Sequence, residues 1–256
     1  MVSKTIQLMG QRMSLRRYAP EPIRPEHLDA IVNSTLRAPT AGNMMLYSVV
    51  QVEDQTKKDR LAETCNHVFI AGAPLVLLFL ADMQRIYDFY RAFDVLEYCR
   101  ENDLPFQTPQ ASSLMTSCCD ALIAAQTSVL AAESLGIGSC YLGDIMGRCE
   151  EHQKLFQLPR WTFPIALVCY GYYPQDMKRR LNSRFERQFL WFQDTYQRLS
   201  REQFEQMYAE IMDKFEGVLR RKDLNLAELT YLNFTLGEAA LEEARSVAAL
   251  LDRWMG

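Results

Sequence analysis

The sequence predicts a body of the α/β or α+β class, followed by a helical C-terminal extension. Two observations carry this prediction. Short β-branched or continuously apolar runs alternate with helical apolar patterns up to about residue 184, and only helical patterns follow. The expected elements of the body are helices over 24–37 and 117–135 and strands over 47–52, 74–81, 139–142 and 163–170.

The two helices of the body have recognisable ends. Pro25 suits the first position of a helix, and the segment stops before Pro39, because a residue that precedes proline is pushed out of the helical region. The Ala-rich helix over 117–135 is apolar on most faces, which is typical of a central buried helix, and Gly136 is its natural C-cap.

The extension begins with a capping-box pattern at Ser200–Gln203, and an apolar stripe runs from Phe204 to Leu219. A second capping box at Asn225–Glu228 leads to a last helix that ends near Trp254. We expect residues 1–184 to form one domain and residues 185–256 to form an extension. Its helices pack either on their own domain or on a partner subunit, and the stripes suit both arrangements.

Charge and composition exclude several classes of protein. The 256 residues carry 28 basic and 32 acidic side chains, so a general nucleic-acid binder is not expected, and residues 1–184 are balanced with 19 of each. The longest uncharged apolar run, 68–81, has 14 residues, fewer than the roughly 20 that span a bilayer. The seven cysteines and three histidines lack metal-ligand spacing, so we expect no metal and a reduced, soluble, cytoplasmic protein.

Two basic segments could bind a phosphate group. Arg12, Ser14 and Arg16 place forked guanidinium donors and a hydroxyl within five residues. Lys178 and Arg180 follow the last expected strand of the body and could close on the same phosphate. Each segment alone is a weak signal, since such clusters of charge are usually solvated surfaces.

Two glycine-containing segments lie at the ends of expected elements. Residues 38–43, Ala-Pro-Thr-Ala-Gly-Asn, join a helix to a strand and form either an ordinary turn or a loop that approaches a flat ligand. Residues 134–144 are not a dinucleotide fingerprint, since the third glycine would fall at Tyr141 and the glycines follow a helix instead of opening one.

In combination, the order and spacing of these segments resemble the FMN-dependent nitroreductase family over roughly residues 8–184. The resemblance implies an α+β, three-layer α-β-α sandwich with a helical C-terminal extension, and a homodimer with FMN at the subunit interface. It also implies the residues that contact FMN. These are Arg12, Ser14, Arg16, Lys178 and Arg180 at the phosphate and ribityl chain, Asn66, Tyr141, Leu142 and Gly143 along the ring, and Pro39, Thr40 and Asn43 from the partner subunit.

Three positions depart from the family pattern. Met44–Tyr47 replace a Gln-Pro-Trp segment, Met13 stands where Arg or His is common, and Asp144 follows Gly143 in place of a second glycine. A carboxylate near the flavin would disfavour its anionic reduced form, unless Asp144 points into solvent.

The resemblance implies an oxidoreductase that takes a hydride from NAD(P)H and reduces nitroaromatic, quinone or flavin acceptors in a ping-pong scheme. No catalytic side chain is expected, because the cofactor carries the chemistry. The alternatives are a flavin-holding or regulatory protein with little turnover and, more remotely, a structural helical partner protein. The residues do not distinguish NADH from NADPH.

Overall fold

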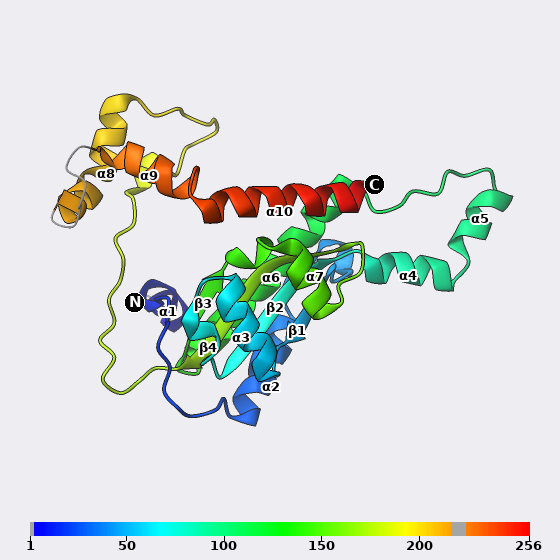
Figure 1. The fold of residues 1–256 in the computed structure, drawn as a ribbon, viewed down its shortest axis with the longest axis horizontal. Coiled ribbons are helices and arrows are strands. Elements are labelled where there is room, and N and C mark those ends of the chain that lie inside the picture. Colours follow the sequence, from blue (N-terminus) through cyan, green and yellow to red (C-terminus); the bar gives the residue numbers. More distant parts are fainter. Residues whose placement is uncertain (1–2, 217–223) are drawn as a thin grey trace. The chain divides into compact units, whose positions relative to one another are not determined.

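A four-stranded antiparallel sheet forms the centre of the molecule. The computed structural model describes residues 3–216 and 224–256. The strands are β1 (Tyr47–Gln51), β2 (Leu75–Asp82), β3 (Ile137–Leu142) and β4 (Thr162–Tyr172), and they lie in the order β1-β2-β4-β3 (Figure 1). Because β1 and β3 are the outer strands, β3 presents one free edge to the rest of the chain.

Both faces of the sheet are covered by helices. On β2, Leu75, Leu77 and Phe79 pack in one core cluster, while Val76, Leu78 and Leu80 pack in another, as the alternation of a strand requires. The helices that supply the first cluster are α2 (Pro25–Thr35) and α6 (Ala111–Ser134), and the second receives α3 (Gln55–Thr64) and the end of α7 (Cys149–Phe156). The expected α+β, three-layer arrangement is confirmed.

In the body, the expected elements agree with the observed ones to within two residues, except at the start of the central helix. In the extension, the last helix expected after the second capping box is two helices, α9 (Leu226–Phe234) and α10 (Glu238–Met255). The helix α6 begins at Ala111, six residues before the expected start, because Gln110 and Ser113 form a capping box. Several short helices were not expected: α1 (Lys4–Gln11), α3, α4 (Gln84–Ala92), α5 (Val95–Glu101) and α7. Short 3-10 turns, η1 (Ala41–Asn43), η2 (Val68–Ile70), η3 (Asp144–Met146) and η4 (Arg187–Phe189), link the elements.

The helix α6 is long and apolar enough to cross a membrane by length and composition. The expectation that no segment reaches this length overlooked α6, because Asp120 and Glu133 interrupt its uncharged run. Both carboxylates are buried, and Ala121, Ala124, Ala125 and Val129 are completely enclosed between the sheet and α2. In this protein α6 is the core helix of a folded body.

The chain divides into two compact units, one of residues 1–180 and 242–256 and one of residues 181–241. The second unit contains α8 (Arg201–Glu216) and α9 (Leu226–Phe234). Both expected capping boxes form, and the rings of Phe185 and Tyr208 meet 5.0 Å apart. The expected stripe extends to Val218 and Leu219, which lie outside the described residues.

The last helix, α10 (Glu238–Met255), contributes most of its length to the first unit. Leu250 and Trp254 are buried against Trp161 and Phe163, and the indole of Trp254 donates to the carbonyl of Gln110 over 3.2 Å. This part of the extension therefore packs on its own domain. The domain limits 1–184 and 185–256 stay a prediction.

An arginine on α10 joins it to α7. The Arg245 guanidinium bonds both carboxylate oxygens of Glu150 at 2.8 Å and also pairs with Glu242. These bonds hold the pKa of Glu150 and of Glu242 at about 2, below the ordinary value of 4.5.

This cluster predicts an acid-dependent loss of stability. Since the folded protein binds these two protons less tightly than the unfolded chain, the stabilisation is complete above a pH of about 4.5 and is lost as the pH falls towards 2. Urea unfolding of Arg245→Met should therefore show a shallower decline of stability over this range than the unsubstituted protein. Arg91→Met, at an exposed arginine outside the cluster, is the control. Parallel pH curves for the unsubstituted protein and Arg245→Met would contradict the assignment.

Candidate functional site

The segment that carries Arg12, Ser14 and Arg16 docks on the outer edge of β3. Leu15 is buried and its N–H donates to the carbonyl of Ser139 over 2.9 Å, while Ser14 forms a parallel bridge to Ser139. The neighbouring residues Ser14 and Arg16 remain exposed, and Arg12 is half-buried at the end of α1. Insertion of Leu15 thus holds the three predicted contact residues at one sheet edge.

A glycine permits this docking. A Cβ atom added to Gly138 would lie 2.6 Å from Leu15 Cδ2 and 2.7 Å from Tyr173 Cζ, both closer than side chains approach. The approach of the segment to β3 therefore requires a residue without a side chain at position 138.

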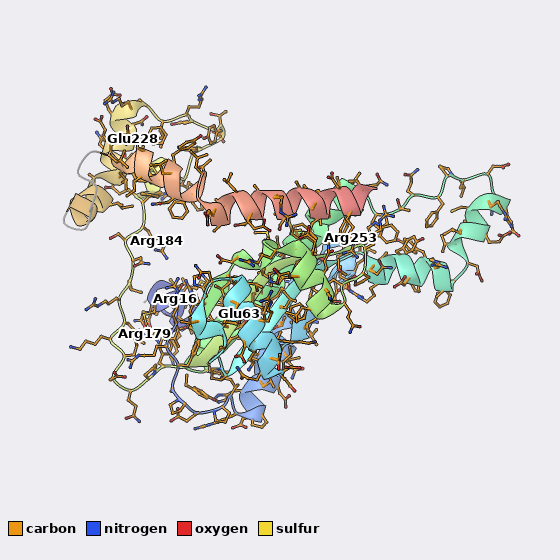
Figure 2. All side chains as sticks on the ribbon, viewed as in Figure 1. Arg16, Glu63, Arg179, Arg184, Glu228 and Arg253 are labelled. Carbon is orange, nitrogen blue, oxygen red and sulfur yellow. The ribbon has the colours of Figure 1, made fainter. Side chains whose placement is uncertain are left out.

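The second basic segment, residues 172–180, joins the first. The Ala19 N–H donates to the carbonyl of Tyr172, and Arg17 pairs with both oxygens of Asp176 at 2.9 Å. Arg179 donates to the carbonyl of Gln11 over 3.0 Å, and Figure 2 shows Arg16 and Arg179 on the α1 side of this unit. The structure therefore brings the segments of Arg12–Arg16 and Lys178–Arg180 to one place.

The basic side chains of these segments differ in whether a carboxylate of the protein pairs with them. Arg179 donates to the buried carboxylate of Glu133 over 2.8 Å and stacks on the ring of Tyr173, whose hydroxyl also donates to Glu133. The side chains of four others form no hydrogen bond or ion pair within residues 3–216 and 224–256: Arg12, Arg16, Lys178 and Arg180. Four cationic side chains of the two segments thus have no ion-pair partner among the described residues.

The cations at this edge act on a nearby thiol. Burial raises the pKa of Cys140, and the charges of Arg16 and Arg12 and a hydrogen bond from Ser14 oppose that rise. The Ser139 hydroxyl is buried beside them and has no partner among the described residues. The resemblance assigned Lys178 and Arg180 and left Arg179 out, and Arg179 is the one that pairs with Glu133. Sequence reasoning missed Glu133, although a carboxylate in a nearly uncharged helix is a usable signal.

The predicted ring contacts lie at the end of β3. Tyr141 is half-buried and its hydroxyl donates to Gln126 over 3.4 Å, and burial raises its pKa. The side chain of Leu142 is buried in the core cluster on the α3 face of the sheet, so only its backbone is available to a ligand. Gly143 is exposed.

Asn66 lies close to this end of β3. It is exposed and has a left-handed backbone conformation with φ of 54°. The neighbouring His67 Nε2 lies 3.5 Å from Oδ2 of Asp144. Asp144, the position that departs from the family pattern, is thus half-exposed and directed towards an imidazole.

A buried histidine connects the end of α3 to the turn that follows β3. His152 Nδ1 lies 2.8 Å from the carbonyl of Ile145 and Nε2 lies 2.8 Å from the hydroxyl of Thr64. A carbonyl only accepts, so Nδ1 donates and Nε2 accepts in the neutral ring, and burial lowers the pKa of His152. These bonds hold residues 64–67 against residues 143–146.

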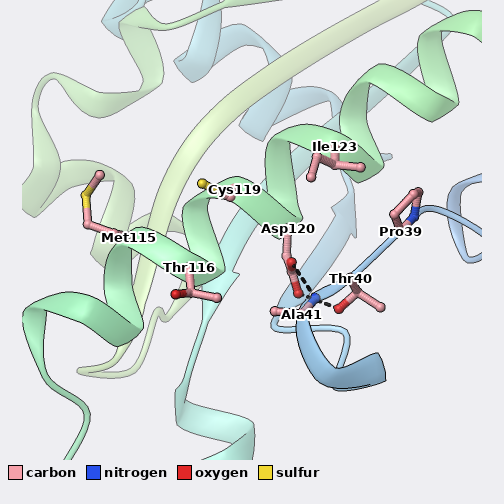
Figure 3. Close-up of a pocket in the computed structure, with 8 residues that line it drawn as sticks. All are labelled: Pro39, Thr40, Ala41, Met115, Thr116, Cys119, Asp120 and Ile123. Carbon is pink, nitrogen blue, oxygen red and sulfur yellow. Dashed lines mark hydrogen bonds between the residues drawn. The ribbon is translucent and has the colours of Figure 1, made fainter. Parts of the chain in front are cut away.

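The loop with Pro39, Thr40 and Asn43 lies elsewhere, against α6. Pro39 and Thr40 line an open cavity of about 420 Å³ together with residues of α6 (Figure 3). No hydrogen bond or ion pair within the described part of the chain joins this loop to residues 12–16. The loop leads into β1, whereas the segment of Arg12–Arg16 docks on β3, and these strands are the opposite edges of the sheet, so a single subunit keeps the two sets of predicted contact residues apart.

Comparisons with known proteins identify the family of this chain. The Nitroreductase family model matches residues 9–172. An "FMN reductase [NAD(P)H]" from Bacillus subtilis is 31% identical over 196 residues, which cover 76% of this chain and 75% of the relative. The chain belongs to the nitroreductase family. The resemblance inferred from the motifs is confirmed.

Other members of the nitroreductase family extend the comparison. An "Oxygen-insensitive NADPH nitroreductase" from Salmonella typhimurium is 26% identical, with 70% of this chain and 71% of the relative covered. The crystal structure of nitroreductase A from Vibrio parahaemolyticus has the same fold, with a TM-score of 0.82 and 22% identity over 100% of this chain and 99% of that one.

The glycine at the sheet edge of this nitroreductase-family chain provides a test of the docked segment. Gly138→Ala should lower the free energy of unfolding by about 1–3 kcal/mol, because Leu15 and Tyr173 must move. Urea unfolding measures the change. Gly72→Ala is the matched control, since a Cβ at Gly72 meets nothing within 4 Å. Equal stability of the two variants would contradict the close approach.

Proposed function

We propose that this protein is an FMN-dependent oxidoreductase that uses NAD(P)H to reduce small-molecule acceptors. The observation that carries the proposal is the gathering of two basic segments beside β3. Their side chains Arg12, Arg16, Lys178 and Arg180 have no ion-pair partner among the described residues. The chain belongs to a family with members named as an FMN reductase and an NADPH nitroreductase.

The residues at this edge fit a phosphate monoester. Arg12, Arg16, Lys178 and Arg180 offer charged donors that the protein leaves unpaired among the described residues, and Ser14 adds a hydroxyl. A dianionic phosphate supplies the missing counter-charge, and bonds of this type are stronger than neutral ones. In the proposal, these five side chains hold the phosphate and ribityl chain of FMN.

The flavin ring would lie towards the end of β3. Tyr141, the backbone of Leu142 and Gly143 border it on one side, and Asn66 offers an amide from the loop after α3. Since Pro39, Thr40 and Asn43 lie apart from these residues in one subunit, the proposal assigns them to the site of a partner subunit.

A homodimer provides this partner. The helices α2 and α6 share a layer and leave large apolar side chains exposed: Val32, Leu36, Met115, Leu122 and Ile123. Such side chains in adjacent helices are consistent with a face covered by a second copy. We place the dimer in the cytoplasm, with neither membrane nor nucleic acid as a partner.

When bound, FMN supplies a hydride acceptor that is also an electron donor, which allows NAD(P)H and the acceptor to use one pocket in turn. The protein binds and orients it, and no side chain is assigned as catalytic. The acceptor class comprises nitroaromatics, quinones and flavins. The imidazole of His67 lies beside Asp144 and, when protonated, offsets the carboxylate charge that would disfavour an anionic reduced flavin.

Anaerobic reduction tests the activity. Purified protein loaded with FMN should lose its yellow colour when NADH or NADPH is added, and a panel of acceptors should restore it. Absorbance near the flavin band in a stopped-flow instrument measures both steps. A bound flavin that neither nucleotide reduces would favour a flavin-holding protein, and protein that takes up no FMN would favour a purely structural role.

Substitution of the cations tests the phosphate site. Arg16→Ala and Arg180→Ala should each weaken FMN binding by about 1.5–3 kcal/mol, the range for hydrogen bonds to charged groups. Quenching of FMN fluorescence gives the dissociation constant. Arg17→Ala should have a smaller effect, because its guanidinium is an exposed side chain already paired with Asp176. Unchanged affinity in both test variants would remove the assignment.

A further inference from the structure

A buried carboxylate on α6 organises the loop over residues 39–46. Asp120 is 3% exposed, and its side chain points from the core helix towards Thr40 and Ala41 (Figure 3). Its carboxylate accepts a hydrogen bond from the Thr40 hydroxyl, from the Ala41 N–H over 3.0 Å and from the Leu46 N–H over 3.1 Å. All three donors come from the one loop, and Asp120 forms no ion pair within the described residues.

The loop contains residues in an unfavourable backbone conformation, and these hydrogen bonds stabilise the loop in that conformation. Met45 has a φ of 51°, in the left-handed region that costs free energy for residues with a bulky side chain. Asn43 has a φ of 58°, which asparagine tolerates better. The Met45 N–H donates to the Thr40 hydroxyl over 2.8 Å, and that hydroxyl in turn donates to Asp120. Met45 is thus linked to the Asp120 carboxylate through the Thr40 hydroxyl.

A second side chain holds the loop from the opposite end. The Arg85 guanidinium donates to the carbonyl of Met45 and, over 3.3 Å, to that of Tyr47. Arg85 is half-exposed, and its partner Asp82 also accepts from Ser48. The loop is therefore held at Thr40–Leu46 by Asp120 and at Met45–Tyr47 by Arg85.

The held loop forms one wall of the open cavity on α6. Pro39, Thr40 and Ala41 line it together with Met115 and Ile123 of the helix. A loop that a buried carboxylate holds in one conformation can present its side chains to a ligand with little further ordering, which is the support that a contact loop needs.

We propose that Asp120 is a positioning residue, which holds Thr40 and Asn43 in the geometry that contacts the FMN of the partner subunit. The inference rests on the proposed function, since it assigns a structural cause to part of that site. Asp120 itself does not touch the cofactor.

The test compares FMN binding by Asp120→Asn with that by a matched variant of the same helix. An amide has one acceptor oxygen where the carboxylate has two, so Asp120→Asn cannot accept all three bonds and its NH₂ group faces a backbone donor. Ser128→Ala removes a buried hydroxyl of α6 that bonds Tyr170 at 2.6 Å and does not contact the loop. Fluorescence quenching and thermal melts give affinity and stability for both.

We expect at least about tenfold weaker FMN binding in Asp120→Asn and an altered visible circular dichroism of flavin at saturation. Ser128→Ala should lose stability but keep both the affinity and the spectrum of the unsubstituted protein. If Asp120→Asn does not fold, Arg85→Met serves in its place, because it removes two loop contacts from a half-exposed side chain and should weaken binding in the same direction.

The outcomes separate the two proposals. Folded variants of Asp120 or Arg85 that bind FMN with unchanged affinity and spectrum would overturn the positioning role alone. Equal losses in Asp120→Asn and Ser128→Ala would reduce the role of Asp120 to general stability. Absence of FMN binding in the unsubstituted protein would overturn the proposed function and the inference that rests on it.

Discussion

Two carboxylates buried on one core helix determine where the surrounding loops lie. A carboxylate removed from water must be compensated by donors, and α6 carries Asp120 and Glu133 in an otherwise uncharged, tightly packed stretch. Asp120 is compensated by the loop after α2, and Glu133 by Tyr173 and Arg179 after β4. The carboxylates are thirteen positions apart, or about 20 Å along the helix. One helix thus holds two separate segments in place, each through a buried carboxylate whose hydrogen-bond partners among the described residues all come from that segment.

Much of the fold was predictable because its strands are buried. The continuous apolar run at 74–81 and the β-branched run at 47–52 indicate strands directly, and both are observed within a residue or two. The helix α3 was not expected because its sequence, Gln-Thr-Lys-Lys-Asp-Arg-Leu-Ala-Glu-Thr, has little apolar periodicity and is helical through its Asp54 cap and its tertiary contacts. Sheet order depends on contacts distant in sequence, which periodicity does not encode.

The sequence predicted which segments form the candidate site, but it predicted the roles of individual side chains less well. The pattern at 178–180 offers three consecutive cations, all of them exposed, and only the fold shows that Arg179 pairs with the buried carboxylate of Glu133. Leu142 falls within the motif, yet strand alternation directs its side chain into the core. Asp120 was missed because its role depends on a loop eighty residues earlier in the chain.

The docked segment at Ser14–Leu15 also has a consequence for solubility. It covers part of β3, an outer strand whose unpaired N–H and C=O groups would otherwise be open to pairing with another chain. Any ligand that holds Arg12 and Arg16 against this edge also keeps the strand covered, and release of the segment would expose a template for intermolecular sheet growth. The residues that cover this strand are therefore the same ones that the proposed function assigns to the phosphate of FMN.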